Sequence, residues 1–134
     1  MIFLKVLRDF LLEDTTLAEK LGNRIYPTFL YNVKEPIFPC LNFSFGGGIP
    51  EFIPDWVRLL RLDFWVWSQK SYSEASSIYN RLRFVLSSKN FNDTSFSVVL
   101  SELVFPSSLF EPESRLYFLR GIFGLKGRME ENSL

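Results

Sequence analysis

The side chains best suited to acid–base chemistry are the carboxylates of Asp55, Asp63, Glu102, Glu111 and Glu113. Carboxylate catalysis usually combines two such groups at a defined separation, one protonated and one ionised. Asp63 lies inside an alternating apolar segment with Arg61 on the same face, and no second carboxylate stands at a defined spacing from it. A same-face or cross-strand ion pair therefore explains Asp63 better than catalysis.

Histidine is absent from the sequence, and Cys40 is the only cysteine. Histidine-based triads and imidazole-ligated zinc sites are therefore excluded. One cysteine forms neither an internal disulfide nor a multi-cysteine metal cluster, and we interpret Cys40 as a small buried apolar residue. We expect no catalytic, cofactor-binding or metal site, and no enzymatic activity.

Residues 46–48 are consecutive glycines, a composition that also occurs in phosphate-binding loops. Such loops continue into Lys-Ser or Lys-Thr at the start of a helix. Neither feature follows here, so we interpret residues 46–56 as a long connecting loop.

Trp65 and Trp67 stand two residues apart on the strand face that also carries Arg61. Exposed aromatic rings in this arrangement can stack against the bases of single-stranded nucleic acid. Burial of the rings beneath a partner in an oligomer is the other interpretation, and the sequence favours it.

A strand followed by a helix, over residues 57–86, positions these tryptophans. One face of the strand carries the alternating apolar residues Leu60, Leu62, Phe64 and Val66. The helical repeat that follows consists of Ala75, Ile78, Tyr79, Leu82, Val85 and Leu86. Ser71 and Glu74 form a capping-box pair at the helix start. We expect the apolar strand face to pack beneath this helix.

Further helices are predicted over residues 2–12 and 16–21, the second with a capping box formed by Thr16 and Glu19. Further strands are predicted over residues 41–45, 96–101 and 115–123. Prolines make residues 27–39 an irregular or edge segment, and prolines at positions 106 and 112 bound a second loop.

These elements predict an α+β fold with a mainly antiparallel four-stranded sheet, helices packed on one face and a long hairpin loop or arm. The 134 residues suit one domain, which we assign to residues 1–125, and residues 126–134 resemble a disordered tail. Basic and acidic residues cancel at 15 each, so no overall field favours nucleic acid or a membrane surface. The N-terminal segment lacks the pattern of a signal peptide, and we expect synthesis in the cytosol.

The chain is unusually rich in apolar side chains for its size, with a hydrophobic fraction of 47% that includes 15 Phe. Some of this surface is expected to be covered by partners. Several apolar residues lie in segments flanked by proline or glycine, outside the expected core. With the two tryptophans they form the predicted oligomer or partner interface: Ile49, Phe52, Ile53, Leu109, Phe110, Trp65 and Trp67.

The order of these features resembles the tail-completion, or tail-terminator, proteins of long-tailed bacteriophages. The resemblance covers most of the chain. It rests on the apolar N-terminal helix, the segment Leu21–Pro27, the entry Pro36–Pro39 into a strand, the strand Arg61–Trp67, the helix start Tyr72–Ala75 and the late strand from Arg115.

The resemblance implies a virion protein that forms a ring, expected to be hexameric, on the tail tube and joins it to the head connector protein. DNA would pass through the lumen without specific binding. Assembly would take place in the bacterial cytoplasm, with no membrane involved. The alternative is a stand-alone module that binds single-stranded nucleic acid or a peptide through the face of Arg61, Trp65 and Trp67; an enzyme is less favoured than either.

Overall fold

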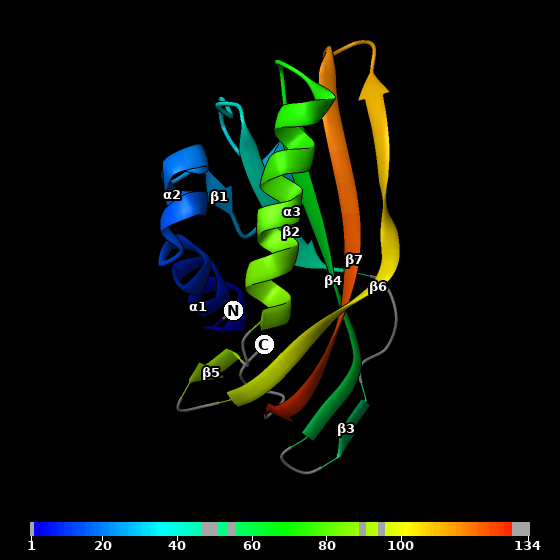
Figure 1. Cartoon of the computed structure of the whole chain (residues 1–134). Coiled ribbons are helices and arrows are strands. Elements are labelled where there is room, and N and C mark those ends of the chain that lie inside the picture. Colours follow the sequence, from blue (N-terminus) through cyan, green and yellow to red (C-terminus); the bar gives the residue numbers. More distant parts are fainter. Residues whose placement is uncertain (1, 47–50, 54–55, 89–90, 94–95, 130–134) are drawn as a thin grey trace.

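The computed structural model describes residues 2–46, 51–53, 56–88, 91–93 and 96–129. In chain order (Figure 1) the elements are α1 (Ile2–Leu12), α2 (Thr15–Leu21), β1 (Ile25–Tyr26), the 3-10 helix η1 (Leu30–Asn32), β2 (Cys40–Phe45), β3 (Glu51–Ile53), β4 (Trp56–Ser68), α3 (Tyr72–Ser88), β5 (Phe91–Asp93), β6 (Phe96–Glu111) and β7 (Leu116–Met129). The α+β class is therefore confirmed.

The strands form one sheet in the order β1-β2-β4-β7-β6-β5, with β3 paired to the first residues of β4. The four long strands β2, β4, β7 and β6 pair antiparallel, as expected, and β1 runs parallel to β2. The prediction of four strands is wrong, because the described residues form seven. The additional strands β1, β3 and β5 are only two or three residues long, too short to show an alternating pattern in the sequence.

A single hydrophobic core lies between the helices and one face of the sheet. On β4, Leu62, Phe64 and Val66 are fully buried, and on α3, Ile78 and Leu82 are at most 1% exposed. All five belong to one cluster, together with buried residues of α1, α2, β2, β6 and β7. The expected packing of the apolar face of β4 beneath α3 is confirmed, and we call this side of the sheet the helix face.

Side-chain caps fix where α2 and α3 begin. Ser71 Oγ accepts a hydrogen bond from the Glu74 amide at 3.1 Å, which is half of the expected capping box. The Glu74 carboxylate instead accepts a hydrogen bond from Ser68 Oγ at 2.7 Å. The cap of α2 is Asp14, whose carboxylate accepts from the Leu17 amide at 3.0 Å, so the box predicted for Thr16 is wrong.

Asp14 also joins α2 to α3. Arg81 on α3 donates hydrogen bonds to the two oxygens of Asp14 from Nε at 3.0 Å and from Nη2 at 2.6 Å. A bidentate pair of this kind fixes direction as well as distance. Its geometry holds the short helix α2 against α3 on the helix face.

Strands β6 and β7 are longer than the sequence predicted. The loop expected between the prolines at positions 106 and 112 is strand up to Glu111, because β6 pairs only with β7 along residues 99–111 and the proline can occupy an edge strand. Residues 126–129, assigned to the tail on sequence grounds, form the end of β7, where Met129 is buried.

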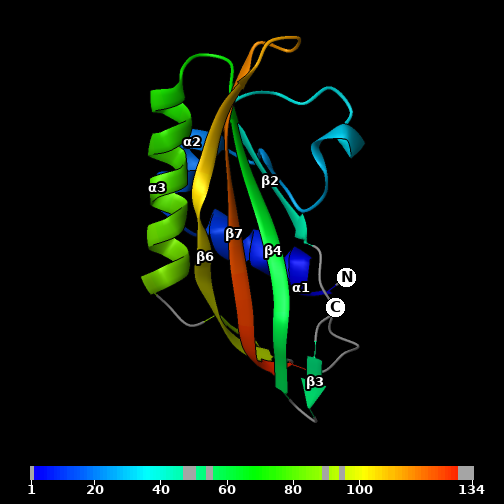
Figure 2. The same cartoon turned by 90° about the vertical axis from the view of Figure 1, so that its right-hand side faces the viewer.

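Among the described residues, no α-helix covers the second side of the sheet, which we call the outer face. Figure 2 shows α3 on one side and the cyan segment around η1, residues 27–39, on the other. This segment packs against β2 and ends at a cis peptide bond between Phe38 and Pro39. The outer face is therefore only partly covered.

Candidate interaction surface

Alternation along β4 places Trp65 and Trp67 on the outer face, opposite the core residues. The indoles of Trp65 and Trp67 stack with their centroids 5.5 Å apart and their planes 7° from parallel. Phe118 on the neighbouring strand β7 contacts both, at centroid distances of 5.4 and 4.9 Å. The three rings form an aromatic cluster across the middle of the outer face.

A chain of hydrogen bonds fixes one end of this cluster. Trp67 Nε1 donates to Asn42 Oδ1 at 2.7 Å, and Asn42 Nδ2 donates to the carbonyl oxygen of Thr28 at 3.0 Å. Asn42 is 2% exposed, and a buried amide needs such partners. The chain therefore ties the segment 27–39 to the sheet and sets the orientation of the Trp67 indole.

An ion pair borders the other end of the cluster. Arg120 Nη2 on β7 donates to Asp63 Oδ2 at 2.7 Å, and the Arg120 guanidinium lies 5.1 Å from the centroid of the Trp65 ring. The ion pair predicted for Asp63 is confirmed as a cross-strand pair. Its partner is on β7 rather than on β4, where Arg61 is exposed.

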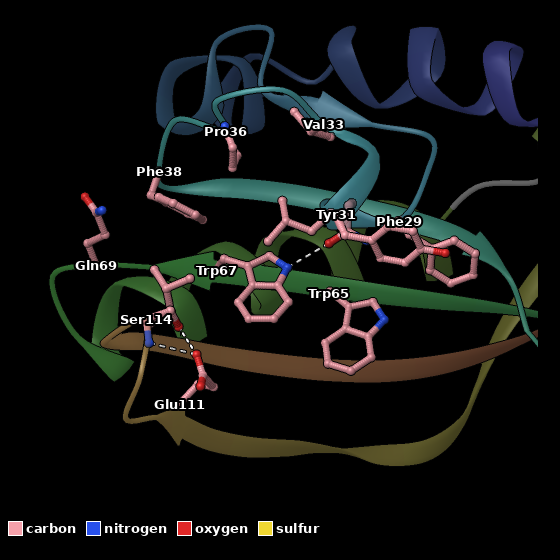
Figure 3. Close-up of a pocket in the computed structure, with 13 residues that line it drawn as sticks. Phe29, Tyr31, Val33, Pro36, Phe38, Trp65, Trp67, Gln69, Glu111 and Ser114 are labelled. Carbon is pink, nitrogen blue, oxygen red and sulfur yellow. Dashed lines mark hydrogen bonds between the residues drawn. The ribbon is translucent and has the colours of Figure 1, made fainter.

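Next to the aromatic cluster the outer face is hollowed into a groove with a volume of about 630 Å³. Figure 3 shows the tryptophans between two walls, one formed by the segment 27–39 and the other by the turn between β6 and β7. The lining residues are Phe29, Leu30, Tyr31, Val33, Pro36, Phe38, Asn42, Trp65, Trp67, Gln69, Glu111, Ser114 and Leu116. We call this feature the outer-face groove.

The two walls of the groove differ in character. On the first wall, Phe29 and Tyr31 stack with centroids 5.4 Å apart and planes at 10°, although the Tyr31 side chain is 82% exposed. On the second wall, Glu111 accepts hydrogen bonds from the backbone amide and the hydroxyl of Ser114. These bonds, chiefly the one from the hydroxyl, hold the pKa of the Glu111 carboxyl below its usual value. The groove thus combines exposed aromatic rings with an ionised carboxylate.

The predicted interface residues do not form one patch. Leu109 pairs with Phe118 and lies on the outer face, whereas Phe110 pairs with Tyr117 and lies on the helix face, where their rings are 4.8 Å apart. The exposed fractions of Leu109 and Phe110 are 62% and 45%.

Two of the remaining predicted interface residues lie in β3. Phe52 and Ile53 are in this strand, which pairs with the start of β4, and Ile49 lies outside the described residues. On sequence grounds these residues were grouped by their apolar character and, apart from the tryptophans, by the flanking prolines and glycines. The structure separates them between a hairpin arm and the two faces of the sheet.

The wall formed by residues 27–39 was missed by the sequence analysis. Three prolines made the segment look like an irregular connection, and irregular segments are usually read as surface loops. The signal that could have identified it is the density of aromatic residues, since Phe29, Tyr31 and Phe38 fall between those prolines.

The expected character of Cys40 is confirmed, since its side chain is fully buried. Burial raises the pKa of the Cys40 thiol to about 12, although the positive charge of Arg24 opposes this shift. A thiol in this state stays protonated at neutral pH and is a poor nucleophile. Within the described residues no group of three or more Cys, Asp or Glu side chains is arranged to hold a metal ion.

Comparison of the sequence with family models and with characterised proteins finds no match. Comparison of the fold finds a similar chain in a solved structure described as "Virion of native gene transfer agent (GTA) particle". The TM-score is 0.72 and the alignment covers 95% of each chain, at 12% sequence identity. The chain therefore shares its whole fold with that chain. No helix in the described part of the present chain is long and apolar enough to cross a membrane.

Proposed function

We propose that this chain is a structural protein of a phage-like virion and that it has no catalytic activity. Within such a particle it forms a closed ring that caps the tail tube and joins it to the head connector. The observation that carries the proposal is the fold match to a chain of a gene transfer agent particle, because the match extends over 95% of both chains. The sequence resemblance to tail-terminator proteins supports the more specific role.

The two edges of the sheet support assembly into a ring. Along residues 99–111 the outer edge of β6 has no strand partner among the described residues, since β5 pairs only with residues 96–98. At the opposite edge, β1 pairs only with Leu41 and Asn42 of β2. Open edges expose unpaired backbone groups and favour pairing with another chain. A contact between two unlike edges is heterologous, so it must close as a ring or continue as a filament.

Exposed apolar side chains accompany the open edge of β6. Leu103, Val104 and Leu109 are 51 to 62% exposed, and the β3 hairpin extends the opposite half of the sheet at one end (Figure 2). Isolated exposed apolar residues are ordinary, but a series along one strand indicates a covered surface. In a ring, the β6 strand of each subunit would be covered by the neighbouring subunit.

The alternative of a nucleic-acid-binding module is less well supported. Among the described residues that line the outer-face groove, the one that carries a charge is Glu111, and a carboxylate repels phosphate. Arg120, which lies beside the tryptophans, is already paired with Asp63. Binding of single strands normally combines stacking rings with a positively charged track, and this groove provides only the rings.

Electron microscopy of mixtures with tail tubes tests the proposal. Tubes that lack their terminal protein should gain a cap of this protein at one end. The double variant Phe52→Ser and Ile53→Ser should remain folded but lose the cap, because it changes the hairpin arm expected to bridge neighbours. Tyr72→Ser, an exposed aromatic substitution on α3, is the matched control and should keep the cap. Tubes that remain uncapped by the wild-type protein would contradict the proposal.

A further inference from the structure

We propose that the outer-face groove is a binding site for an extended, proline-containing apolar segment of a partner protein, with a basic side chain placed at Glu111. The proposal does not depend on ring formation, because every wall of the groove belongs to one subunit.

Two aromatic side chains of the groove are exposed to solvent. Tyr31 and Phe29 are 82% and 45% exposed, and they stack on each other above the sheet. Through Asn42, hydrogen bonds join the Thr28 carbonyl of this wall to the Trp67 indole, which fixes the position of the wall on the sheet. The volume of this concave, largely apolar site falls in the range of about 300 to 1,000 Å³ that is usual for ligand sites.

The floor of the groove is a sheet face rather than a sheet edge, because Trp65 and Trp67 project from a strand that is paired on both sides. A ligand there cannot form the backbone hydrogen bonds of an added strand. Its backbone must therefore adopt a conformation that is stable without them. The polyproline II conformation meets this condition, because its carbonyl groups are free and its rings pack on aromatic side chains. Trp65 Nε1 has no hydrogen-bond partner in the described part of the chain, and it is not buried. It can donate to a ligand carbonyl.

The charge of the groove selects among ligands. Both Ser114 hydrogen bonds go to Glu111 Oε2, and hydrogen bonds from Ser114 and from the Glu113 backbone hold the pKa of the carboxyl below its usual value, so Glu111 carries a negative charge at the groove. No lysine or arginine is among the described lining residues to balance this charge. A lysine or arginine at one end of the bound segment would complement the carboxylate, whereas a phosphate-bearing ligand would be repelled.

Fluorescence polarisation with a defined probe tests this site. The probe is a labelled peptide of proline-proline-leucine repeats that ends in arginine; control probes replace each proline by glycine or the arginine by glutamate. The variants are Tyr31→Ser, Trp65→Phe and Glu111→Gln, with Tyr72→Ser as a matched control outside the groove. Circular dichroism establishes that each variant is folded, which is expected because Tyr31 is largely exposed.

We expect saturable binding of the proline-leucine-arginine probe, weakened at least about 10-fold by Tyr31→Ser and about 3- to 10-fold by Trp65→Phe through loss of the indole donor. Tyr72→Ser should change binding less than about 2-fold. Glu111→Gln should weaken this probe about 2- to 5-fold and leave the glutamate probe no weaker than before.

Three outcomes would overturn the assignment. The first is no saturable peptide binding at millimolar concentration, and the second is binding that Tyr31→Ser leaves unchanged. The third is Tyr31-dependent binding of a labelled oligothymidine in place of the peptide, which would assign the groove to nucleic acid. Since the assay uses the free subunit, its failure would leave the test with tail tubes untouched.

Discussion

The two faces of β4 are made by the same thirteen residues and have opposite roles. On the helix face, Leu62, Phe64 and Val66 are fully buried and belong to the core. On the outer face, Trp65 and Trp67 keep part of their surface exposed and line a groove. The comparison indicates that one face of the sheet stabilises the fold, whereas the other keeps large aromatic side chains accessible to partners.

The largest expected effect comes from a charge placed on the helix face. Leu62→Asp buries an unpaired carboxylate in the core, which should lower the free energy of unfolding by more than about 4 kcal/mol. This loss should prevent folding, since the free energy of unfolding of a whole domain is only about 5 to 15 kcal/mol. Arg61→Asp changes the adjacent, exposed position on the outer face and should cost less than about 0.5 kcal/mol. Circular dichroism and chemical denaturation of both variants measure this difference. A cooperatively melting Leu62→Asp protein would show that the faces are assigned backwards.

A smaller effect is expected where β7 passes beneath α3. A Cβ at position 121 would lie 1.9 Å from Tyr79 Oη, and that hydroxyl donates to Glu102 at 2.5 Å. Gly121→Ala should therefore destabilise the protein by about 1 to 3 kcal/mol, measured by urea denaturation.

The Gly121→Ala effect should depend on the hydroxyl group of Tyr79. Adding Tyr79→Phe removes the nearest of three clashing atoms, while two ring carbons at 2.7 and 2.8 Å remain. It should therefore recover part of the lost stability, which a double-mutant cycle measures. If the stability losses of Gly121→Ala and Tyr79→Phe simply add in the double variant, the Tyr79 hydroxyl does not lie close to Gly121.

The free energy of unfolding should depend on pH through one titratable group on each face, Cys40 on the outer face and Tyr79 on the helix face. The Cys40 thiol, opposite Trp67 in the register, has its pKa raised by burial from 9.0 to about 12. On the helix face, burial and the Glu102 carboxylate raise the pKa of the Tyr79 hydroxyl. The unfolded chain loses these protons at lower pH than the folded chain. The contribution of these two groups to the free energy of unfolding should therefore be constant well below pH 9 and fall as pH rises toward 12.

Denaturation at a series of alkaline pH values separates the two contributions. Cys40→Ala should remove the part of the fall that begins near pH 9, and Tyr79→Phe should remove a part that begins at higher pH. An unchanged profile in Cys40→Ala would mean that the thiol is not buried.

The smallest effect is expected for nucleic acid on the outer face. The chain has no net charge and Glu111 lines the groove, so labelled oligonucleotides should show no saturable binding at physiological salt below roughly the micromolar range of nonspecific contacts. Trp65→Ala and Trp67→Ala should therefore change nothing in this titration. Tight binding that these substitutions abolish would favour the nucleic-acid module instead.

Local patterns predicted the helix face well. The alternation of β4 and the helical repeat of α3 identified which side chains are buried, because periodicity reflects burial directly. The ion pair of Asp63 was predicted in kind but not in partner. Arg120 lies far along the sequence, and only the pairing of β4 with β7 brings the two together.

The outer face was harder to predict, because proline occurs both in loops and in edge strands. Proline predicted a loop within 106–112, where the chain continues as an open edge strand. The same residue type marked residues 27–39 as irregular, which is correct, but irregular structure here forms a wall of the groove. A proline excludes a backbone donor and says nothing about what the neighbouring side chains contact.

Whether the subunits assemble into a ring is measured by the molar mass of the wild-type protein, determined by light scattering over a wide range of concentration. If the outer face and the open edges are assembly surfaces, the mass should rise from that of a monomer to a single larger value, six subunits by the resemblance to tail terminators, and then remain constant because a ring closes. Leu109→Ser, an exposed change on the open strand β6, should keep the monomer folded and shift assembly to higher concentration. A wild-type protein that stays monomeric at every concentration, and also fails to bind tail tubes, would contradict the account.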